Sequence, residues 1–376
     1  MENLQRNETM NSASNNTKLM IAGPMPLHPE VLASLSTPMI SHRSREFSSI
    51  FSETIASAKH IFKTTHDVVI LPCSGTGGLE AVVSNFMSPG DSVAVAINGF
   101  FGDRFADIMR AYGIEPILVK VDWGRPVLAK DVVETIQRHP DVKAVFVVHN
   151  ETSTGVISEI ADISRAVKAI NPNILVVVDA VSSLGGADIR TDKWNLDVVV
   201  SSTQKALMAP PGLCIISISD AAWQSMEFTS SPRYYLDLRR IRKEGQQGMT
   251  LVTPPVPIVF GLKKALQLLL QEGLQNVFKR NLEMRDKVIS AIKPLGIKLV
   301  AKEKYASPTM SALRLPPGIS SQEFRDHVEA RYSLLLAPGL GPLAHDCFRI
   351  GHMGYVAPSD ISATMSVLKR ALGHFN

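Results

Sequence analysis

The sequence predicts an α/β fold, with a large domain built on a mostly parallel seven-stranded sheet and a smaller C-terminal α+β domain. Three observations support this prediction. Between residues 66 and 220, short β-branched runs alternate with longer stretches of helical periodicity, a pattern typical of parallel strands joined by helices. Runs such as residues 145–148 are apolar at every position, as strands buried on both faces are. After residue 273 the alternation gives way to a different mixture of helices and strands.

The elements of the large domain follow from this periodicity. Strands are expected at residues 68–72, 92–97, 115–119, 144–149, 174–179, 197–201 and 213–217. Helices are expected at residues 77–87, 103–112, 129–139 and 160–169. A stretch rich in Pro, Tyr and Arg, residues 228–258, then interrupts the pattern and is expected to cross the surface.

The smaller domain begins after a long amphipathic helix, which is expected at residues 258–272 and ends at Gly273. Helices are then expected at residues 274–292, 321–332 and 359–372, and strands at residues 298–300, 309–314 and 348–351. The large domain is therefore assigned to residues 18–272 and the smaller domain to residues 273–376. Residues 1–17 are polar and rich in asparagine, so a disordered N-terminal tail is expected.

The composition excludes several classes of protein. The net charge of +4 is too small and too dispersed to indicate a nucleic-acid partner. The basic cluster at residues 239–243 is expected to be a solvated helix end rather than a phosphate site. Cys73, Cys214 and Cys347 lie far apart without metal-ligand spacing, so neither a metal site nor a disulfide framework is expected. No apolar run approaches the roughly 20 residues of a membrane span, and a signal peptide is not recognisable. We therefore expect a cytoplasmic protein without membrane contact.

A lysine and an aspartate at strand ends point to the chemistry. Lys205 follows the apolar run 196–200, among small and hydroxylic residues. A lysine whose pKa is lowered by its site becomes a nucleophile, and its usual covalent use is a Schiff base with a carbonyl. Asp179 ends another apolar strand, 26 positions earlier. This carboxylate suits the acidic partner that pyridoxal phosphate needs at its pyridinium nitrogen. The alternative for Lys205 alone is a solvated loop lysine.

A glycine-rich turn supplies a candidate phosphate site. Residues 73–80 follow a predicted strand and open a predicted helix. Backbone N–H groups at such a helix start bind phosphate, with help from the helix dipole. Ser74 and Thr76 add hydroxyl donors. The segment matches neither the Walker pattern nor the dinucleotide-binding glycine pattern, and a tight turn with an N-cap is the alternative interpretation.

Three further positions complete the candidate site. Phe100 or Phe101 follows a strand and is suited to lie flat on a heterocycle, with core packing as the alternative. Residues 149–155 close another strand with polar groups, and ligands bind beyond the carboxyl ends of parallel strands. Arg349 stands inside an apolar strand of the smaller domain. Its guanidinium is the best group for bidentate capture of a carboxylate, whereas a half-exposed structural arginine is the alternative.

Together these motifs resemble the class V aminotransferases of fold type I, which are pyridoxal phosphate enzymes. The similarity is greatest to the alanine–glyoxylate and serine–glyoxylate (serine–pyruvate) branch and runs from about Met20 to Leu368. The segments that carry it are residues 151–155, 178–186, 204–207, 210–212, 232–238 and 349–351.

The resemblance implies a role for each residue around the cofactor. Lys205 would hold pyridoxal 5'-phosphate as an internal aldimine, Asp179 would pair with the ring nitrogen, and Val181 would back the ring. The phosphate would be held by Ser74, Gly75, Thr76 and Gln204. Thr152 would face the ring hydroxyl, and Phe101 would stack on the ring where the family usually has Trp or Tyr.

The resemblance also implies substrate and partner contacts. Thr250 and Thr253 would reach the phosphate of the neighbouring subunit, so a homodimer with shared sites is expected; Thr250 stands where some members have Tyr. Arg349 would clamp the substrate carboxylate. Met25 would narrow the substrate pocket. His42 and Arg43 match a pair that helps to bind a substrate phosphate in phosphoserine aminotransferases but also occurs in the glyoxylate branch.

The predicted function is transamination between a small L-amino acid (alanine, serine or similar) and a small 2-oxo acid (glyoxylate or pyruvate). It follows a ping-pong scheme in which Lys205 is the general acid and base. A phosphoserine- or aspartate-type aminotransferase is an alternative. A pyridoxal phosphate lyase or a cysteine desulfurase of the same fold is another, although Cys347 stands inside a predicted strand and not in the mobile loop that carries the cysteine of desulfurases. A non-catalytic binding protein on the same scaffold is the third.

Overall fold

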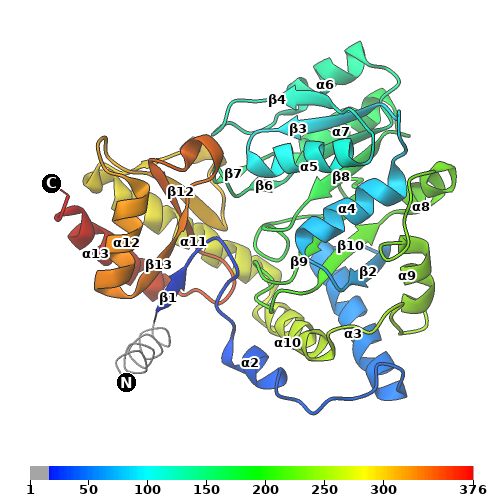
Figure 1. The fold of residues 1–376 in the computed structure, drawn as a ribbon, viewed down its shortest axis with the longest axis horizontal. Helices are drawn as coiled ribbons and strands as arrows, with labels where there is room; N and C mark the ends of the chain where they lie inside the picture. Colours follow the sequence, from blue (N-terminus) through cyan, green and yellow to red (C-terminus); the bar gives the residue numbers. More distant parts are fainter. Residues whose placement is uncertain (1–16, 376) are drawn as a thin grey trace, which may run out of the picture.

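A computed structural model describes residues 17–375. The large domain is built around a seven-stranded sheet (Figure 1). The strand order is β2-β10-β9-β8-β5-β3-β4. These strands are β2 (Asp67–Leu71), β3 (Val93–Ile97), β4 (Ile117–Lys120), β5 (Ala144–Val148), β8 (Leu175–Asp179), β9 (Val198–Ser202) and β10 (Cys214–Ile218). Strand β10 is antiparallel to both its neighbours, and the other pairs are parallel. The predicted α/β fold with seven mostly parallel strands is therefore confirmed.

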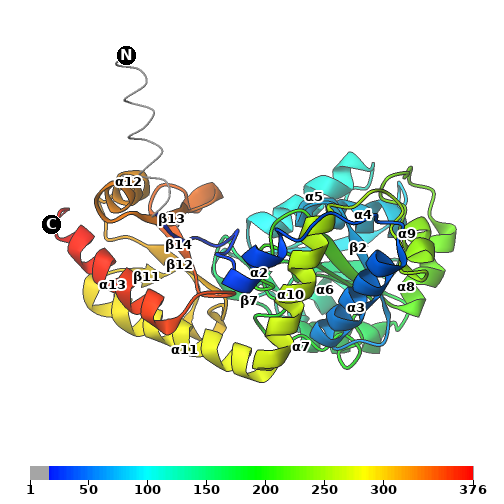
Figure 2. The same cartoon turned by 90° about the horizontal axis from the view of Figure 1, so that it is seen from below.

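Helices cover both faces of this sheet, as Figures 1 and 2 show. They are α2 (Pro29–Ser34), α3 (Arg45–Phe62), α4 (Gly75–Phe86), α5 (Phe100–Ala111), α6 (Ala129–Arg138), α7 (Ile160–Ile170), α8 (Asp220–Ser225), α9 (Leu238–Gly245) and α10 (Val256–Glu272). Alternate residues of a strand face opposite sides. In β2, Val68 and Ile70 belong to the core under α3, α6, α7 and α10, whereas Val69 and Leu71 belong to the core under α4 and α5. This double burial explains why the strands are apolar throughout.

The smaller domain contains a second sheet with strand order β1-β13-β14-β12-β11. Its elements are β1 (Lys18–Met20), β11 (Lys298–Leu299), β12 (Met310–Arg314), β13 (Leu334–Pro338), β14 (Cys347–Gly351), α11 (Leu274–Ile292), α12 (Ser321–Tyr332) and α13 (Pro358–Leu372). Strand β1 pairs with β13, Lys18 opposite Leu334. Residues 18–20, which the sequence boundary grouped with the large domain, thus lie in the smaller sheet. Neither β1 nor β13 was predicted.

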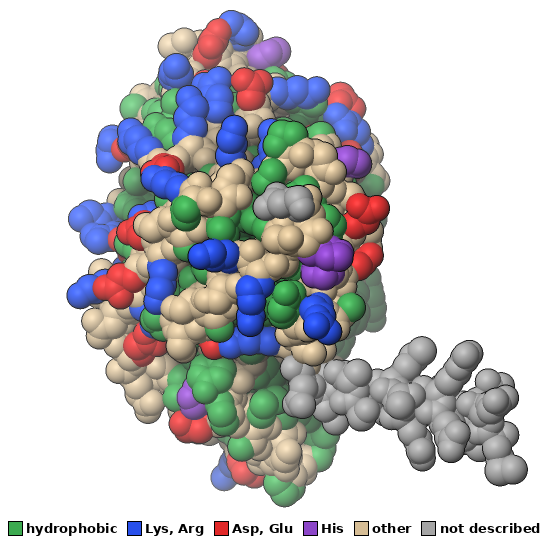
Figure 3. Space-filling view, turned by 90° about the vertical axis from the view of Figure 1, so that its left-hand side faces the viewer, with side chains coloured by type: hydrophobic (Ala, Val, Ile, Leu, Met, Phe, Trp, Pro, Cys, Tyr) green, Lys and Arg blue, Asp and Glu red, His purple; other side chains and the backbone are tan. Residues whose placement is uncertain are grey.

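Short elements fill the connections. A hairpin of β6 (Asn150–Glu151) and β7 (Val156–Ile157) follows β5. Single 3₁₀ turns lie at Met226–Phe228, Lys293–Leu295, Glu303–Tyr305 and Gly341–Leu343. The basic cluster at residues 239–243 lies on α9, where Asp237 caps the helix start and Arg239 and Arg240 are exposed. Figure 3 shows Lys and Arg side chains spread among Asp and Glu over the face of the smaller domain.

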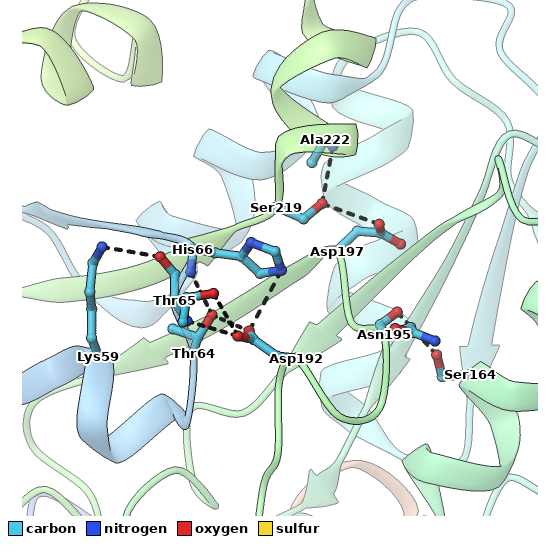
Figure 4. A network of polar contacts seen from close by, with 10 residues as sticks. All are labelled: Lys59, Thr64, Thr65, His66, Ser164, Asp192, Asn195, Asp197, Ser219 and Ala222. Carbon is cyan, nitrogen blue, oxygen red and sulfur yellow. Dashed lines mark hydrogen bonds and ion pairs between the residues drawn. The ribbon is translucent and has the colours of Figure 1, made fainter.

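Two carboxylates lie at the amino-terminal edge of the large sheet, and Figure 4 shows Asp192 beside Thr64, Thr65 and His66, and Asp197 beside Ser219. Asp197, just before β9, accepts hydrogen bonds from Lys168 Nζ at 2.6 Å and from the Val176 amide at 2.7 Å. Asp192 accepts from the amide and the hydroxyl of Thr65, at 2.8 and 2.9 Å, just before β2. These two sets of hydrogen bonds lie at the strand starts, at the edge opposite the one where Asp179 ends β8.

Two further expectations concern the N-terminal tail and membrane spans. Apart from Thr17, the expected tail at residues 1–17 lies outside the described residues. Within residues 17–375, no helix is both long enough and apolar enough to cross a membrane.

Candidate active site

Nine of the fifteen predicted site residues line one cavity of about 300 Å³, at the carboxyl ends of the parallel strands. They are Ser74, Gly75, Thr76, Phe101, Asp179, Val181, Gln204, Lys205 and Arg349. Arg349 comes from β14 of the smaller domain, so both domains contribute to the wall. The remaining lining residues, which the sequence analysis did not assign individually, are Ala22, Gly23, Leu79, Arg104 and Ala337.

The glycine-rich turn forms the first turn of α4. The Ser74 hydroxyl accepts a hydrogen bond from the Gly77 amide at 3.2 Å, and the Ser74 carbonyl accepts one from Gly78 at 3.1 Å. The amides of Gly75 and Thr76 have no hydrogen-bond partner within residues 17–375. Unpaired amides at a helix start attract anions, and the helix dipole adds to this attraction. The turn can therefore bind a phosphate.

Gly75 allows the close approach that this turn requires. A Cβ atom at this position would lie 2.9 Å from Val181 Cγ2 and 3.3 Å from Ser202 Oγ. A side chain would push the turn away from the loop that follows Asp179. The Ser202 hydroxyl lies beside this turn, and Gln204 is part of the cavity wall. Both the Ser202 hydroxyl and the Gln204 amide oxygen are buried without a hydrogen-bond partner in the described chain. Buried polar atoms of this kind usually have a partner, so a polar ligand would satisfy them.

Asp179 is a buried carboxyl group whose charge needs a partner. It is the last residue of β8, and its Oδ1 accepts a hydrogen bond from the Val181 amide at 2.8 Å. Burial raises the pKa of Asp179 to about 7, and nearby Glu151 adds to this effect. The hydrogen bond from Val181 and the positive charges of Arg104 and Lys205 oppose it. A cationic group of a ligand beside Asp179 would favour the carboxylate further.

The side chain of Lys205 packs against the backbone of Gly23, which belongs to the N-terminal segment. A Cβ atom on Gly23 would lie 2.6 Å from Lys205 Cδ, and Gly23 has a φ of 107°, so any side chain there is both strained and blocked. The Lys205 ammonium donates a hydrogen bond to the Ala22 carbonyl. Burial, followed by the positive charge of Arg349, lowers the pKa of Lys205 to about 8, although Asp179 opposes this. The amine is therefore neutral more often than an ordinary lysine near pH 8.

Arg349 is held by carbonyl groups of both domains. Its Nε donates to Pro338 O at 2.7 Å, and its Nη1 donates to Thr152 O at 3.1 Å. The side chain is buried, and within residues 17–375 it has no carboxylate within ion-pair distance. Burial lowers the pKa of Arg349 to about 10, which still leaves it charged at neutral pH. Its remaining N–H donors can bind a carboxylate. Thr152 contributes its backbone rather than lining the cavity.

The sequence analysis missed Arg104, which lies one helical turn after Phe101 on α5. Its Nη1 donates to Thr76 Oγ1 at 3.0 Å, and its guanidinium carbon lies 4.8 Å from the centre of the Phe101 ring. The available signal was the spacing of three residues, which places two side chains on one face of a helix.

Glu151 was also missed as a support for this helix. Its carboxylate accepts hydrogen bonds from the Phe101 and Gly102 amides at 3.0 and 3.2 Å and from the Ser153 hydroxyl at 2.6 Å. Burial raises the pKa of Glu151, and these hydrogen bonds oppose the rise. Glu151 thus fixes the start of α5 and, with it, the position of Phe101.

Besides Thr152, five predicted residues lie outside the wall of this cavity. Met25 is buried in the core of the smaller domain, and a Cβ atom on Gly351 would lie 3.1 Å from Met25 Cε; Met25 is not among the residues that line the cavity. Arg43 Nη1 donates to the Thr250 carbonyl at 2.8 Å, and Thr250 lines a separate cavity beside β2. His42 is half-buried and Thr253 is exposed. Within a single chain, these last four residues do not line the cavity.

The residues present fit pyridoxal phosphate in three respects. The start of α4 suits the phosphate, Asp179 suits a protonated ring nitrogen, and Lys205 suits the carbonyl carbon. Phe101 and Val181 supply apolar surface between these polar groups. Within residues 17–375, there is no group of three or more His, Cys, Asp or Glu residues that could hold a metal ion.

Comparisons with known proteins agree with this arrangement. The sequence profile of the family described as aminotransferase class-V matches residues 28–326. An L-aspartate–glyoxylate aminotransferase from Paracoccus denitrificans is 36% identical over 340 residues, covering 89% of this chain and 86% of that protein. The "Soluble hydrogenase, small subunit" of a Synechococcus strain is 41% identical over 356 residues, covering 94% of this chain and 92% of that protein. The crystal structure of an alanine–glyoxylate aminotransferase from Nostoc has a TM-score of 0.90 at 26% identity, covering 95% of both chains.

Proposed function

This chain belongs to the class V aminotransferases, and from that premise we propose that it is a pyridoxal 5'-phosphate enzyme acting on small substrates. It transfers the amino group of a small L-amino acid, such as alanine or serine, to a small 2-oxo acid, glyoxylate or pyruvate. One observation carries the proposal: the Lys205 amine, the Asp179 carboxyl group, the start of α4 and Arg349 meet in one cavity.

Each group has a separate task in this proposal. When bound, the cofactor supplies a carbonyl group to which amines add and a ring that withdraws electrons. Asp179 keeps the proton on the ring nitrogen, and the start of α4 binds the phosphate. Phe101 covers the ring. Arg349 binds the substrate carboxylate and so orients the amino acid beside Lys205.

Lys205 carries the proton in this scheme. A general acid and base works best when its pKa lies near the working pH, and the pKa of Lys205 is lowered to about 8, mainly by burial. The amine accepts the proton from the substrate Cα and would return it to the carbon that was the carbonyl carbon of the cofactor. The Ala22 carbonyl, which accepts a hydrogen bond from the Lys205 ammonium, is the group that holds the amine when it is protonated.

The size of the cavity and the named relatives guide the choice of substrate. About 300 Å³ lies at the lower end of the range for ligand sites, which favours small substrates beside the cofactor. Both the Paracoccus and the Nostoc aminotransferases are named for glyoxylate, whereas their amino donors differ. Glyoxylate is therefore the acceptor to test first. The Synechococcus relative has a different activity in its name, and the site described above supports amino transfer.

A homodimer and a cytoplasmic location are further parts of the proposal. Thr250, Thr253, His42 and Arg43 do not reach the cavity of their own chain, so a role at the site requires a partner subunit. All three cysteines are free thiols, as in reducing compartments. Sedimentation showing a fully active monomer would contradict the shared site.

A cysteine desulfurase would need a reactive thiol, and Cys347 is poorly suited to this. It is buried in β14, and burial raises the pKa of its thiol to about 12. The thiolate is the reactive form, so this cysteine is nearly all protonated at neutral pH.

The decisive experiment is a donor–acceptor matrix with purified protein. Alanine, serine and aspartate would be paired with glyoxylate, pyruvate and 2-oxoglutarate, and both products would be measured. We expect turnover only when an amino donor and an oxo acid are present together, with the highest rates for glyoxylate or pyruvate. Breakdown of the amino acid without a second oxo acid would instead indicate a lyase.

A further inference from the structure

We propose that Arg104 is a cofactor-binding residue that holds the phosphate end of pyridoxal phosphate. Its guanidinium supplies a fixed positive charge there and orients the Thr76 hydroxyl toward the phosphate. This inference rests on the proposed cofactor and adds a residue that the sequence motifs did not include.

The position of Arg104 places it at the phosphate end of the cavity. It lines the cavity together with Ser74, Gly75 and Thr76, and its Nη1 donates a hydrogen bond to Thr76 Oγ1 at 3.0 Å. Thr76 belongs to the first turn of α4, whose amides at Gly75 and Thr76 have no partner among the described residues. The guanidinium and the helix start thus act on the same region.

The charge of Arg104 is not neutralised within the described chain. No carboxylate of residues 17–375 forms an ion pair with it, although Arg110 on the same helix pairs with Asp107 and Glu115. The side chain is half-buried. A partly buried cation without an anionic partner is unfavourable, and a phosphate dianion would provide that partner. Arginine is well suited to this because its planar donor groups match phosphate oxygens.

The hydrogen bond from Arg104 also decides whether the Thr76 hydroxyl donates or accepts toward the phosphate. A hydroxyl has one hydrogen to donate and two lone pairs that accept. Because Thr76 Oγ1 accepts from Arg104, its own hydrogen stays free to donate to a phosphate oxygen. Without Arg104 the same hydroxyl could rotate and present a lone pair, which would repel the phosphate.

A competing role for Arg104 is to support the aromatic ring of Phe101. The guanidinium carbon lies 4.8 Å from the centre of the Phe101 ring and 5.3 Å from that of Phe100, close enough for a cation–π contact. The two roles predict different losses of ligand affinity when Arg104 is replaced. A phosphate contact matters only for ligands that carry the phosphate, whereas a support for Phe101 matters equally for pyridoxal, which has the ring but no phosphate.

The test compares these two ligands on the apo-protein. Dissociation constants for pyridoxal phosphate and pyridoxal would be measured by absorbance and fluorescence titration for wild type, Arg104→Gln and Arg104→Lys. Arg110→Gln is the matched control, because Arg110 lies on the same helix but outside the cavity. Circular dichroism would establish that each variant is folded.

We expect Arg104→Gln to weaken pyridoxal phosphate roughly 10- to 100-fold, as for the loss of a charge-assisted hydrogen bond. Pyridoxal affinity should change less than about threefold. Arg104→Lys should recover part of the loss, because it keeps the charge without the planar donors. Arg110→Gln should bind both ligands as wild type does. If Arg104→Gln does not fold, the same comparison with Arg104→Lys decides, with a selective loss of pyridoxal phosphate expected.

Two results would overturn the inference. Equal losses for both ligands would assign Arg104 to the support of Phe101, and unchanged affinity for pyridoxal phosphate would remove it from the site. A wild-type protein that fails to bind pyridoxal phosphate at all would refute the proposed function itself, so the two failures are distinguishable.

Discussion

Replacing Asp179 by asparagine should stabilise the apo-protein while it damages cofactor binding. The buried carboxyl group has a pKa raised to about 7, mainly by burial, because the fold provides no full ion pair for its charge. Without cofactor, ionised Asp179 therefore opposes folding. Asparagine has nearly the same shape and can still accept the hydrogen bond from Val181, but it carries no charge.

The pKa shift sets the size and the direction of the effect. A carboxyl group whose folded-state pKa is raised contributes stability that is complete below its unfolded pKa, 3.8, and is lost as the pH rises through about 7. At 1.36 kcal/mol per pKa unit, the full loss is about 4 kcal/mol. Between pH 5 and pH 8, the free energy of unfolding of Asp179→Asn should rise relative to wild type by roughly 2–3 kcal/mol.

The assay is urea unfolding of both apo-proteins at pH 5 and pH 8. Altered packing or hydrogen bonding shifts the variant equally at both pH values, so it cancels in the difference between them. The matched control is Asp122→Asn, which removes an exposed surface carboxylate and should show a smaller difference because solvent screens the charge. With saturating pyridoxal phosphate the order should reverse, because wild type gains more binding free energy.

The reasoning would be refuted by a difference between pH 5 and pH 8 below about 1 kcal/mol. It would also be refuted if the variant lost stability as the pH rose. Either result would mean that the protein solvates or pairs the Asp179 charge in the absence of ligand.

Three further predictions concern the other walls of the cavity. Lys205→Ala should abolish turnover, and borohydride reduction of the wild-type holoenzyme should fix the cofactor to the peptide that contains Lys205; a label on another lysine would refute the assignment. Arg349→Ala should lower kcat/KM for L-alanine about 30-fold to several thousand-fold, as expected for a charged partner worth roughly 2–5 kcal/mol, with partial recovery in Arg349→Lys; a folded Ala variant within about threefold of wild type would remove Arg349 from the site. Gly23→Ala should displace Lys205, because the new Cβ would lie 2.6 Å from Lys205 Cδ; loss of activity with retained secondary structure is expected, and unchanged kcat would contradict the contact.

The sequence by itself determined the larger sheet and the central pair of the candidate site. Strands buried on both faces are apolar throughout, a local property that shows in the chain without knowledge of its partners. Asp179 and Lys205 were found because the first ends and the second follows such a strand, and parallel strands bring their carboxyl ends to one edge. The start of α4 was recognisable for a similar reason, since a helix cap is made by neighbours in sequence.

The tertiary structure alone decided the features that depend on distant partners. Strand β1 has three residues and exists through its pairing with β13, more than 300 positions away, so no local pattern could reveal either strand. The separation of Met25, Arg43 and Thr250 from the cavity likewise depends on packing between distant segments. Arg104 became a site residue only when α5 was placed against α4, with its guanidinium on Thr76. Local periodicity determines which elements form, whereas long-range packing decides which side chains meet.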